Sequence, residues 1–370
     1  VDGQPVLSVL PPLRSLVVVE DLSHFAKGRR QRMLDKRLQA VASEPFNLEK
    51  GPLLRTNLFK LDANVHVFLI TFHHIVADGW SLGCFMAEMS TAYEQIVRGD
   101  AVSLPVLPIQ YIDYAAWQQA NLLSNEQLQR SVDYWRAYLE GAETLLLPTD
   151  FTRPTVQSYQ GKRWAFELPN GLTSQLEKFS QQQKTTLFTV LLGGFHILLY
   201  RFSQQTDFCV GTPVAGREHP DITNLMGYFV NTSVSRASIH PADSSVSYLQ
   251  RLHQSLMAND ATEKMPFEQL LEVLNVPREM SHSPLFQVMF ALQNIPLPAL
   301  EIEGLALTPQ PVDLNISRYD MTLELWQEEG QLQGVMEYNT ELFKVETIAS
   351  LVQSYAVLLE NMVMYPQHGV

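Results

Sequence analysis

The sequence contains little cysteine and comparatively little positive charge. Its two cysteines, Cys84 and Cys209, lie far apart and lack the Cys or His spacing of a zinc site, so neither a disulfide framework nor a structural zinc is expected. This usage is typical of a reducing cytoplasm. Asp and Glu number 39 against 26 Lys and Arg, which gives a formal net charge of −13. Because nucleic acid attracts the opposite charge, the composition argues against a general nucleic-acid role.

Long hydrophobic runs and a leader segment are also lacking. The longest apolar stretch, residues 187–202, is interrupted by two glycines, a histidine and an arginine, and it is shorter than the roughly 20 residues of a membrane-spanning helix. No membrane span is therefore expected. The N-terminal VDGQPVLSVLPP has neither the basic region nor the cleavable apolar segment of a secretory signal, and it has no initiator Met. We expect the chain to be a piece of a longer cytoplasmic protein.

Apolar residues make up 46% of the chain, which is enough for a large core in about two or three packing units. Hydrophobic periods of two and of 3.6 residues alternate, which predicts a mixed α/β fold. Strands are expected at residues 5–10, 15–22, 65–72, 207–212, 228–235, 286–293 and 319–325. Helices are expected at residues 23–44, 82–97, 108–123, 125–141, 172–183, 187–202, 247–259, 268–274 and 345–364.

A change of composition suggests where the chain divides. Residues 145–161 hold two prolines and several turn formers without a helical period, which indicates a connection between lobes. Two lobes are expected, at 1–150 and 162–370, with a linker at 151–161. No short repeat or low-complexity tract is present.

The sharpest local motif is HHIVADGWS at residues 73–81, between an expected buried strand and an expected helix. Neighbouring side chains on a strand face opposite sides, so only one of His73 and His74 faces a cleft. No third ligand lies near and H-E-x-x-H is absent, so a metal site is not expected. G-x-S-x-G is absent and Ser81 is too near His74 to be its nucleophile, so a covalent intermediate is not expected. A lone histidine beside an apolar strand is more often a core residue than a catalyst.

Five segments of the chain, this motif among them, resemble the signatures of one protein family. HHIVADGWS resembles the HHxxxDGxS signature of condensation domains of nonribosomal peptide synthetases, and its shorter form HHxxxDG is shared by chloramphenicol-acetyltransferase-like acyltransferases. Four more segments resemble the family's signatures in the expected order: YIDYAAW (111–117), MGYFVNTSVSR (226–236), KMPFEQL (264–270) and REMSHSPLFQVMF (278–290). The family's first roughly 50 to 70 residues, with S-x-A-Q-x-R-L-W and R-H-E-x-L-R-T segments, have no counterpart here.

The resemblance implies a pseudo-dimer of two chloramphenicol-acetyltransferase-like lobes in a V, each an α+β two-layer sandwich. The N-terminal lobe is the donor side, the C-terminal lobe is the acceptor side, and the active site lies at their junction along a tunnel. A carrier domain docks at each mouth and delivers its substrate on a phosphopantetheine arm, so no intrinsic cofactor or metal is expected. The resemblance further implies that the domain works as a monomer within a multidomain synthetase, with an adenylation domain as a neighbour.

The resemblance also implies an acyltransferase reaction, the formation of an amide bond between a donor aminoacyl or peptidyl thioester and the α-amine of an acceptor aminoacyl thioester. By the same resemblance, His74 is expected to face the tunnel and to accept a hydrogen bond from that amine, either as general base or as an orienting group. Gly79 donates its N–H to the tetrahedral oxyanion. His73 is structural, and Asp78 pairs with an arginine, for which Arg217 is the first candidate and Arg55 the second.

The remaining candidates are expected to line the tunnel or to support it. They are Trp80 as tunnel wall, Ser81 at the helix start, Asn231 as either a backbone partner or a tunnel residue, and Ser283 near the acceptor pocket. Tyr111, Tyr114 and Trp117 are expected to pack rather than to bind substrate. In LLGGFHILL (191–199), His196 stands where a carrier domain's LGGxS site has its serine, so this segment is expected to be a core helix.

Three functions remain open from the sequence. The first is the amide-forming domain, whose DGWS form resembles the subtype that accepts L-amino acids on both sides. The intact motif argues against epimerising and heterocyclising relatives. The second is an acyltransferase that uses a soluble acyl thioester donor. The third is a condensation-like module that only recruits a partner.

Overall fold

The computed structural model describes residues 6–11, 17–122, 125–262, 265–277, 279–293, 301–302, 304–310 and 312–370. Two of the segments that resemble family signatures begin at Lys264 and Arg278, which lie outside these described residues. The fold is mixed α/β, and this confirms the predicted class.

Internal contacts divide the chain into two compact units. Unit 1 is formed by the described residues of Val1–Gln119, Gly216–Phe229 and Ile295–Leu314, and unit 2 by those of Ala120–Ala215, Val230–Asn294 and Asn315–Val370. No single cut in the sequence separates these units, because two segments of the second half pack with the first. The lobes 1–150 and 162–370, the linker 151–161 and the V-shaped arrangement stay predictions.

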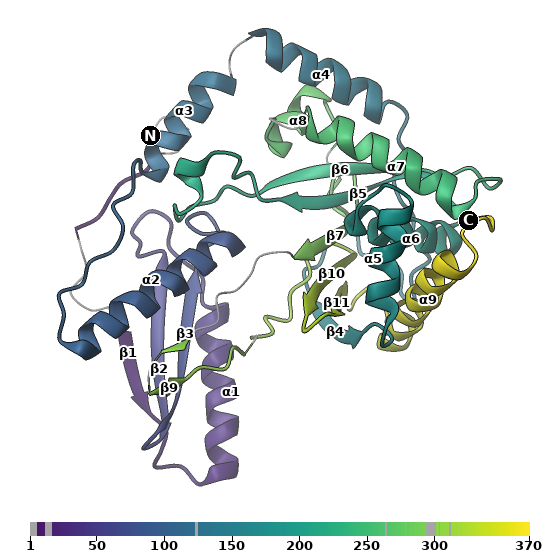
Figure 1. The fold of residues 1–370 in the computed structure, drawn as a ribbon. Helices are drawn as coiled ribbons and strands as arrows, with labels where there is room; N and C mark the ends of the chain where they lie inside the picture. The colour runs from purple at the N-terminus through teal and green to yellow at the C-terminus, as the bar shows by residue number, and fades with distance from the viewer. Residues whose placement is uncertain are drawn as a thin grey trace. The chain divides into compact units, whose positions relative to one another are not determined.

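Unit 1 is built on a three-stranded sheet of order β1-β2-β3 (Figure 1). β1 (Val17–Asp21) runs parallel to β2 (Leu54–Asp62), with α1 (Lys27–Ser43) as the crossover, and β3 (Val65–Phe72) returns antiparallel. Leu34 of α1 is buried with Leu22, Phe59 and Leu69, and Leu38 and Val41 continue the same helical stripe. Unit 1 also holds α2 (Gly79–Arg98), the start of α3 (Tyr111–Leu122), the 3-10 turn Pro220–Ile222 and a small hairpin of β8 (Glu301–Ile302) and β9 (Leu305–Ala306).

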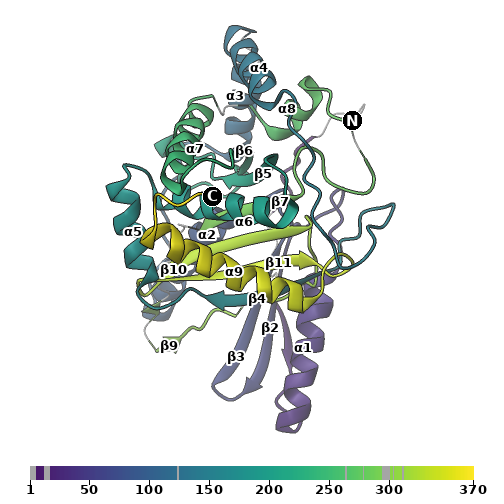
Figure 2. The same cartoon turned by 90° about the vertical axis from the view of Figure 1, so that its right-hand side faces the viewer.

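Unit 2 is built on a six-stranded mixed sheet of order β4-β11-β10-β7-β5-β6 (Figure 2). Its strands are β4 (Gly161–Glu167), β5 (Asp207–Val214), β6 (Asn231–Ser238), β7 (Val288–Gln293), β10 (Met321–Glu328) and β11 (Gln331–Asn339). Its helices are α4 (Asn125–Leu139), α5 (Leu172–Gln182), α6 (Leu187–Ser203), α7 (Ser245–Asp260), α8 (Phe267–Val273) and α9 (Val345–Met364).

Alternation along the strands of unit 2 sends successive side chains to opposite faces of the sheet. Phe208 and Val210 of β5 pack with α5, α6, α7 and α9, while Cys209 between them packs with α4 and α8. The sheet is therefore covered by helices on both faces.

Several expectations for individual elements need correction. Residues 65–72 do form a strand, but only Leu69 is buried, because β3 lies at the edge of its sheet. The described part of 5–10 is not a strand, and the strand expected at 228–235 begins at Asn231. β2, β4 and β11 were not predicted, since charged or amide side chains interrupt their apolar pattern.

Two parts of unit 2 have the length and apolar composition of a membrane-spanning helix. Among the described residues, α9 is long and apolar enough by itself, and α5 and α6 are so only when taken together as a pair bent by 104°. In the structure these helices carry buried residues of the unit 2 core, among them Ile348, Tyr355 and Leu359 of α9.

The centre of α6 contains a fully buried histidine, in the segment expected to be a core helix. His196 Nδ1 lies 2.8 Å from the Tyr248 hydroxyl, and Nε2 has no hydrogen-bond partner within the described part of the chain. Burial lowers the pKa of His196 to about 3. The ring is therefore neutral in the folded protein at pH values where an unfolded chain would protonate it.

We expect this histidine to make unit 2 sensitive to acid. Its stabilising effect is complete above the unfolded pKa of about 6.5 and is lost as the pH falls toward the folded pKa, because the unfolded chain binds an additional proton in this range. Its contribution to the free energy of unfolding should be about 2 kcal/mol smaller at pH 5 than at pH 7. Hydrogen exchange of the α6 amides should show this difference in the parent and not in His196→Gln. The exposed-site control His240→Gln should behave like the parent, and equal pH dependence in all three proteins would contradict the assignment.

Candidate active site

The loop between β3 and α2 binds one nitrogen of the His74 ring. The His73 N–H donates to the Leu53 carbonyl at 3.0 Å, and the Val76 N–H donates back to the His73 carbonyl at 3.1 Å, so the chain turns directly after the strand. His74 Nδ1 lies 2.9 Å from the Ala77 carbonyl oxygen. A carbonyl only accepts, so Nδ1 carries the proton and the neutral ring keeps a lone pair on Nε2. The exposed His74 can therefore accept a hydrogen bond through Nε2.

His73 uses the same ring nitrogen, Nδ1, in the opposite role and makes different contacts. Its Nδ1 accepts a hydrogen bond from the Ile75 N–H at 3.1 Å, and its ring meets the Phe46 ring edge-on with centroids 5.9 Å apart. The proton of the neutral His73 ring therefore lies on Nε2. The two adjacent histidines are thus held in different tautomers by their local contacts.

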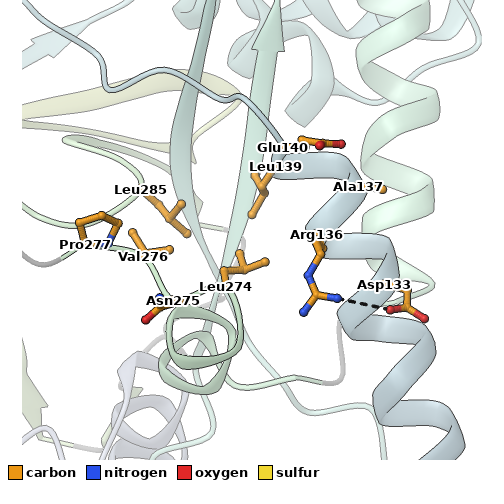
Figure 3. Close-up of a pocket in the computed structure, with 10 residues that line it drawn as sticks. All are labelled: Asp133, Arg136, Ala137, Leu139, Glu140, Leu274, Asn275, Val276, Pro277 and Leu285. Atoms are coloured by element: carbon orange, nitrogen blue, oxygen red, sulfur yellow. Dashed lines mark ion pairs between the residues drawn. The ribbon is translucent and has the colours of Figure 1, made fainter.

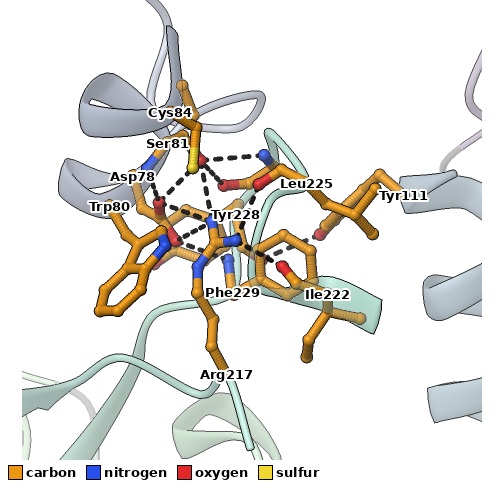
Figure 4. A network of polar contacts seen from close by, with 12 residues as sticks. Asp78, Trp80, Ser81, Cys84, Tyr111, Arg217, Ile222, Leu225, Tyr228 and Phe229 are labelled. Atoms are coloured by element: carbon orange, nitrogen blue, oxygen red, sulfur yellow. Dashed lines mark hydrogen bonds and ion pairs between the residues drawn. The ribbon is translucent and has the colours of Figure 1, made fainter. Parts of the chain in front are cut away.

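Asp78 is the buried centre of a polar network (Figure 4). It is the N-cap of α2, and its Oδ1 accepts from the Ser81 N–H at 2.8 Å and from the Ser81 hydroxyl at 2.7 Å. Its Oδ2 accepts from the Phe229 N–H at 3.1 Å. Burial opposes ionisation, but the bonds from Ser81 and Phe229 and the charge of Arg217 outweigh it and hold the pKa of Asp78 below its ordinary value. Asp78 is therefore an anion at neutral pH and cannot supply a proton.

Arg217 is the cation that faces Asp78. Its Nη2 lies 3.0 Å from Asp78 Oδ1, and the two side chains are only 2% and 4% exposed. Nη1 donates to the carbonyls of Ile222 and Leu225 at 2.8 and 2.7 Å, and the guanidinium lies 4.1 Å from the centre of the Phe229 ring. These bonds satisfy both terminal nitrogens within unit 1, so Arg217 holds the carboxylate and the 222–229 segment together.

Arg55, the second candidate partner of Asp78, is engaged elsewhere. It forms an ion pair with Glu44 at 2.8 Å, and its guanidinium lies over the Phe46 ring at 3.8 Å.

Ser81 belongs to this network and lies in the first turn of α2, where the helix start was expected. Its hydroxyl is buried and also accepts hydrogen bonds from the Gly227 N–H and from Arg217 Nη2, both at 3.0 Å. A place for Ser81 in a tunnel stays a prediction. The helix cap expected near Ser81 is Asp78, because the carboxylate accepts the first free N–H groups of the helix.

Trp80 and Gly79 occupy the first turn of α2. The Trp80 indole Nε1–H donates to the Thr223 carbonyl at 2.8 Å, which ties the helix to the same segment as Arg217. The N–H of Gly79 lies at the helix N-terminus, where no intrahelical acceptor exists, and it forms no hydrogen bond within the described part of the chain. An exposed N–H at the positive end of a helix suits an anionic oxygen. The tunnel role of Trp80 and the oxyanion role of Gly79 stay predictions.

The segment that carries Tyr228 was missed as part of the site. The Asp78 N–H donates to the Gly227 carbonyl at 3.2 Å, and the Tyr111 hydroxyl donates to the Tyr228 carbonyl at 2.9 Å. A Cβ at Gly227 would lie 2.2 Å from Tyr111 Cδ2, so only glycine permits this approach. The Tyr228 ring meets the His74 ring at 84° with centroids 5.2 Å apart. Only the motif around residues 226–236 marked this segment in the sequence.

The three aromatic residues of α3 do not behave alike. Tyr111 and Tyr114 pack around Ile222, Leu225 and Phe229, as expected. Trp117 is 61% exposed, and its ring packs at the surface against the Tyr114 ring with centroids 5.9 Å apart.

The two site candidates of unit 2 interact with backbone. Asn231 Nδ2 donates to the Met265 carbonyl at 3.0 Å, and Oδ1 accepts from the N–H groups of Thr232 and Phe267 at 2.8 and 3.1 Å. This is the backbone-pairing alternative for Asn231. The Ser283 carbonyl accepts from Gln287 Nε2 at 3.1 Å, and its side chain is half-buried. A place for either residue in a tunnel stays a prediction.

A separate hollow of about 420 Å³ lies in unit 2 between α4 and the segment after α8 (Figure 3). Its walls include the apolar Leu139, Leu274 and Val276, with Arg136 and Asp133 paired at 3.7 Å. None of the predicted site residues lines it. Within the described ranges no group of three or more His, Cys, Asp or Glu side chains is placed to hold a metal ion, and Cys84 and Cys209 are free thiols.

Comparison with known proteins assigns the family. The condensation-domain model matches residues 1–370. The chain is 35% identical over 332 residues to gramicidin S synthase 2 of Brevibacillus brevis, covering 90% of this chain and 7% of that protein. It is 40% identical over 351 residues to malpinin synthetase of Mortierella alpina, covering 94% and 4%. The chain thus spans a small fraction of these curated relatives.

Solved structures agree with this assignment. A four-domain nonribosomal peptide synthetase bound to AMP and glycine is 26% identical, with a TM-score of 0.85 over 97% of this chain and 28% of that chain. The X-domain from teicoplanin biosynthesis, 23% identical, shares the fold with a TM-score of 0.87 over 97% and 80%. The chain belongs to the condensation-domain family of nonribosomal peptide synthetases. Peptide-bond formation between carrier-bound substrates is the function of this family.

The buried ion pair makes a prediction about stability. Asp78→Ala removes the helix cap and leaves the Arg217 charge buried without its partner, so we expect a loss of about 3–5 kcal/mol in the free energy of unfolding of unit 1. Asp62→Ala, which removes the exposed partner of Arg30, should cost less than about 1 kcal/mol. Urea unfolding, followed by hydrogen exchange of the β2 and α2 amides, measures both. Similar small losses in the two variants would show that the Asp78 pair does not hold unit 1 together.

Proposed function

We propose that this chain joins a donor aminoacyl or peptidyl thioester to the α-amine of an acceptor aminoacyl thioester, with His74 as its catalytic residue. The observation that carries the proposal is the exposed His74 ring with its proton held on Nδ1, which leaves Nε2 as an acceptor. The family membership supplies the reaction class. Both substrates would arrive on phosphopantetheine arms of carrier domains, so the chain itself needs no cofactor.

The reaction forms one C–N bond and breaks one C–S bond. The acceptor nitrogen attacks the thioester carbonyl carbon, a tetrahedral oxyanion forms, and its collapse releases the donor carrier's thiol as the amine loses a proton. His74 Nε2 accepts the hydrogen bond from the amine N–H, either taking that proton or orienting the nitrogen lone pair toward the carbonyl carbon. Gly79 N–H donates to the oxyanion. Asp78 and Arg217 act through structure, because Asp78 is already an anion bound to Arg217.

The partners follow from the proposed chemistry and from the nature of the relatives. An upstream carrier domain presents the donor and a downstream one presents the acceptor, with an adenylation domain as a neighbour in one multidomain synthetase. We further propose that the domain acts as a monomer within that synthetase, in the cytoplasm. The two curated relatives named above are a synthetase and a synthase, and this chain matches only a small part of each. This supports the proposal that the chain acts as one domain among several in a large synthetase.

The test is single-turnover amide formation with donor-loaded and acceptor-loaded carrier domains. We expect His74→Ala to lower the rate by roughly 10²-fold or more with folding intact, the magnitude of a positioned acid–base group. His66 is an exposed histidine of β3, the strand that precedes the His74 loop, and His66→Ala should leave the rate unchanged.

Other outcomes would select another function. Equal rates for His74→Ala and the parent would remove His74 from the chemistry. Product from a soluble acyl thioester at the carrier-bound rate would favour the general acyltransferase. No product from any variant would favour the recruitment module.

A further inference from the structure

The ring of Tyr228 lies beside the His74 ring and has no role in the proposed reaction. The polar contact of His74 within the described residues is the Nδ1 bond to the carbonyl of Ala77, a residue of the same loop. One bond at one ring nitrogen leaves the imidazole able to swing about that bond. Catalysis through Nε2 needs the ring plane held as well, because a displacement of about 1 Å can cost roughly 10²-fold in rate.

We propose that Tyr228 is a positioning residue whose ring holds the His74 imidazole in the orientation that presents Nε2 to the acceptor amine. The two rings meet at 84° with centroids 5.2 Å apart, the edge-to-face geometry that aromatic pairs favour. Tyr228 acts through His74, so the inference rests on the proposed function of that histidine.

A positioning residue must itself be fixed, and the backbone of Tyr228 is anchored on both sides. Before it, the Gly227 N–H donates to the Ser81 hydroxyl at 3.0 Å and the Gly227 carbonyl accepts from the Asp78 N–H at 3.2 Å. After it, the Phe229 N–H donates to Asp78 Oδ2 at 3.1 Å. Its own carbonyl accepts from the Tyr111 hydroxyl at 2.9 Å.

These anchors join Tyr228 to the residues that follow His74 in the chain. Asp78 and Ser81 begin α2, directly after the loop that carries His74. The buried Phe229 and the Asp78–Arg217 pair keep the 227–229 segment against this helix start. The polar network therefore holds the backbone that carries the Tyr228 ring close to the start of α2, directly after the loop that carries His74.

Kinetics of three variants test the inference. Tyr228→Leu removes the aromatic ring and should lower the single-turnover rate at saturating carriers by about tenfold or more, with the half-saturating concentration of acceptor-loaded carrier unchanged. Tyr228→Phe keeps the aromatic ring and should restore the rate to within about threefold of the parent. Tyr93→Leu, at an exposed tyrosine of α2, should behave like the parent.

A double-mutant cycle separates this inference from the proposed function. In a His74→Ala background, Tyr228→Leu should change the remaining rate by less than about twofold, because its effect passes through the missing ring. An equal loss in both backgrounds would show that Tyr228 acts elsewhere and would overturn the inference. A parent-like rate in Tyr228→Leu alone, with His74→Ala impaired, would overturn the inference and leave the role of His74 standing.

A second measurement does not depend on turnover. The ¹³C relaxation of the His74 Cε1 atom reports the motion of the ring, and we expect greater mobility in Tyr228→Leu and parent-like mobility in Tyr228→Phe. Unchanged mobility in Tyr228→Leu would overturn the inference even if the rate fell. If His74→Ala kept full activity, the proposed function would fail, and this measurement would still decide whether Tyr228 holds the ring.

Discussion

The ion pair between Asp78 and Arg217 is the interaction on which the rest of the site depends. Both side chains are almost completely buried, and two charges in such a place are stable only when each is paired and hydrogen-bonded. The carboxylate uses its bonds to start α2 and to hold the Phe229 amide, and the guanidinium uses its bonds to fold the 222–225 turn. One pair thereby joins two segments that are 139 residues apart.

This arrangement separates the residues that support the site from those that face outward. Asp78, Ser81 and Arg217 are buried and bonded to one another, so a substitution at any of them would impair activity through structure. His74 and Gly79 lie at the two ends of the loop between β3 and α2, and both are exposed. His74 presents the lone pair of Nε2, and Gly79 presents its backbone N–H. An acceptor and a donor so close together in the chain suit a reaction in which an amine loses a proton while an oxyanion forms.

Local patterns predicted much of the fold, and contacts between distant segments account for what was missed. The run ending at Met364 has a strong helical period, and α9 has the expected bounds. β2 was missed because Arg55, Asn57 and Lys60 interrupt its apolar pattern, and it forms by pairing between β1 and β3. In the candidate site, the motif singled out His74 and Asp78, and the expected pairing of Asp78 with Arg217 is present. The contact of Tyr228 with His74 depends on how two remote segments fold together, which no local period encodes.

The proposed chemistry depends most directly on the tautomer of His74, whose neutral ring holds its proton on Nδ1 and leaves Nε2 free to accept. Long-range ¹H–¹⁵N correlation spectra of the imidazole distinguish the two tautomers. We expect an Nε2 resonance typical of an unprotonated ring nitrogen and an Nδ1 resonance typical of a protonated one, at a pH where the ring is neutral. A neutral ring protonated on Nε2 would contradict this assignment, because that nitrogen would then have no lone pair for the acceptor amine.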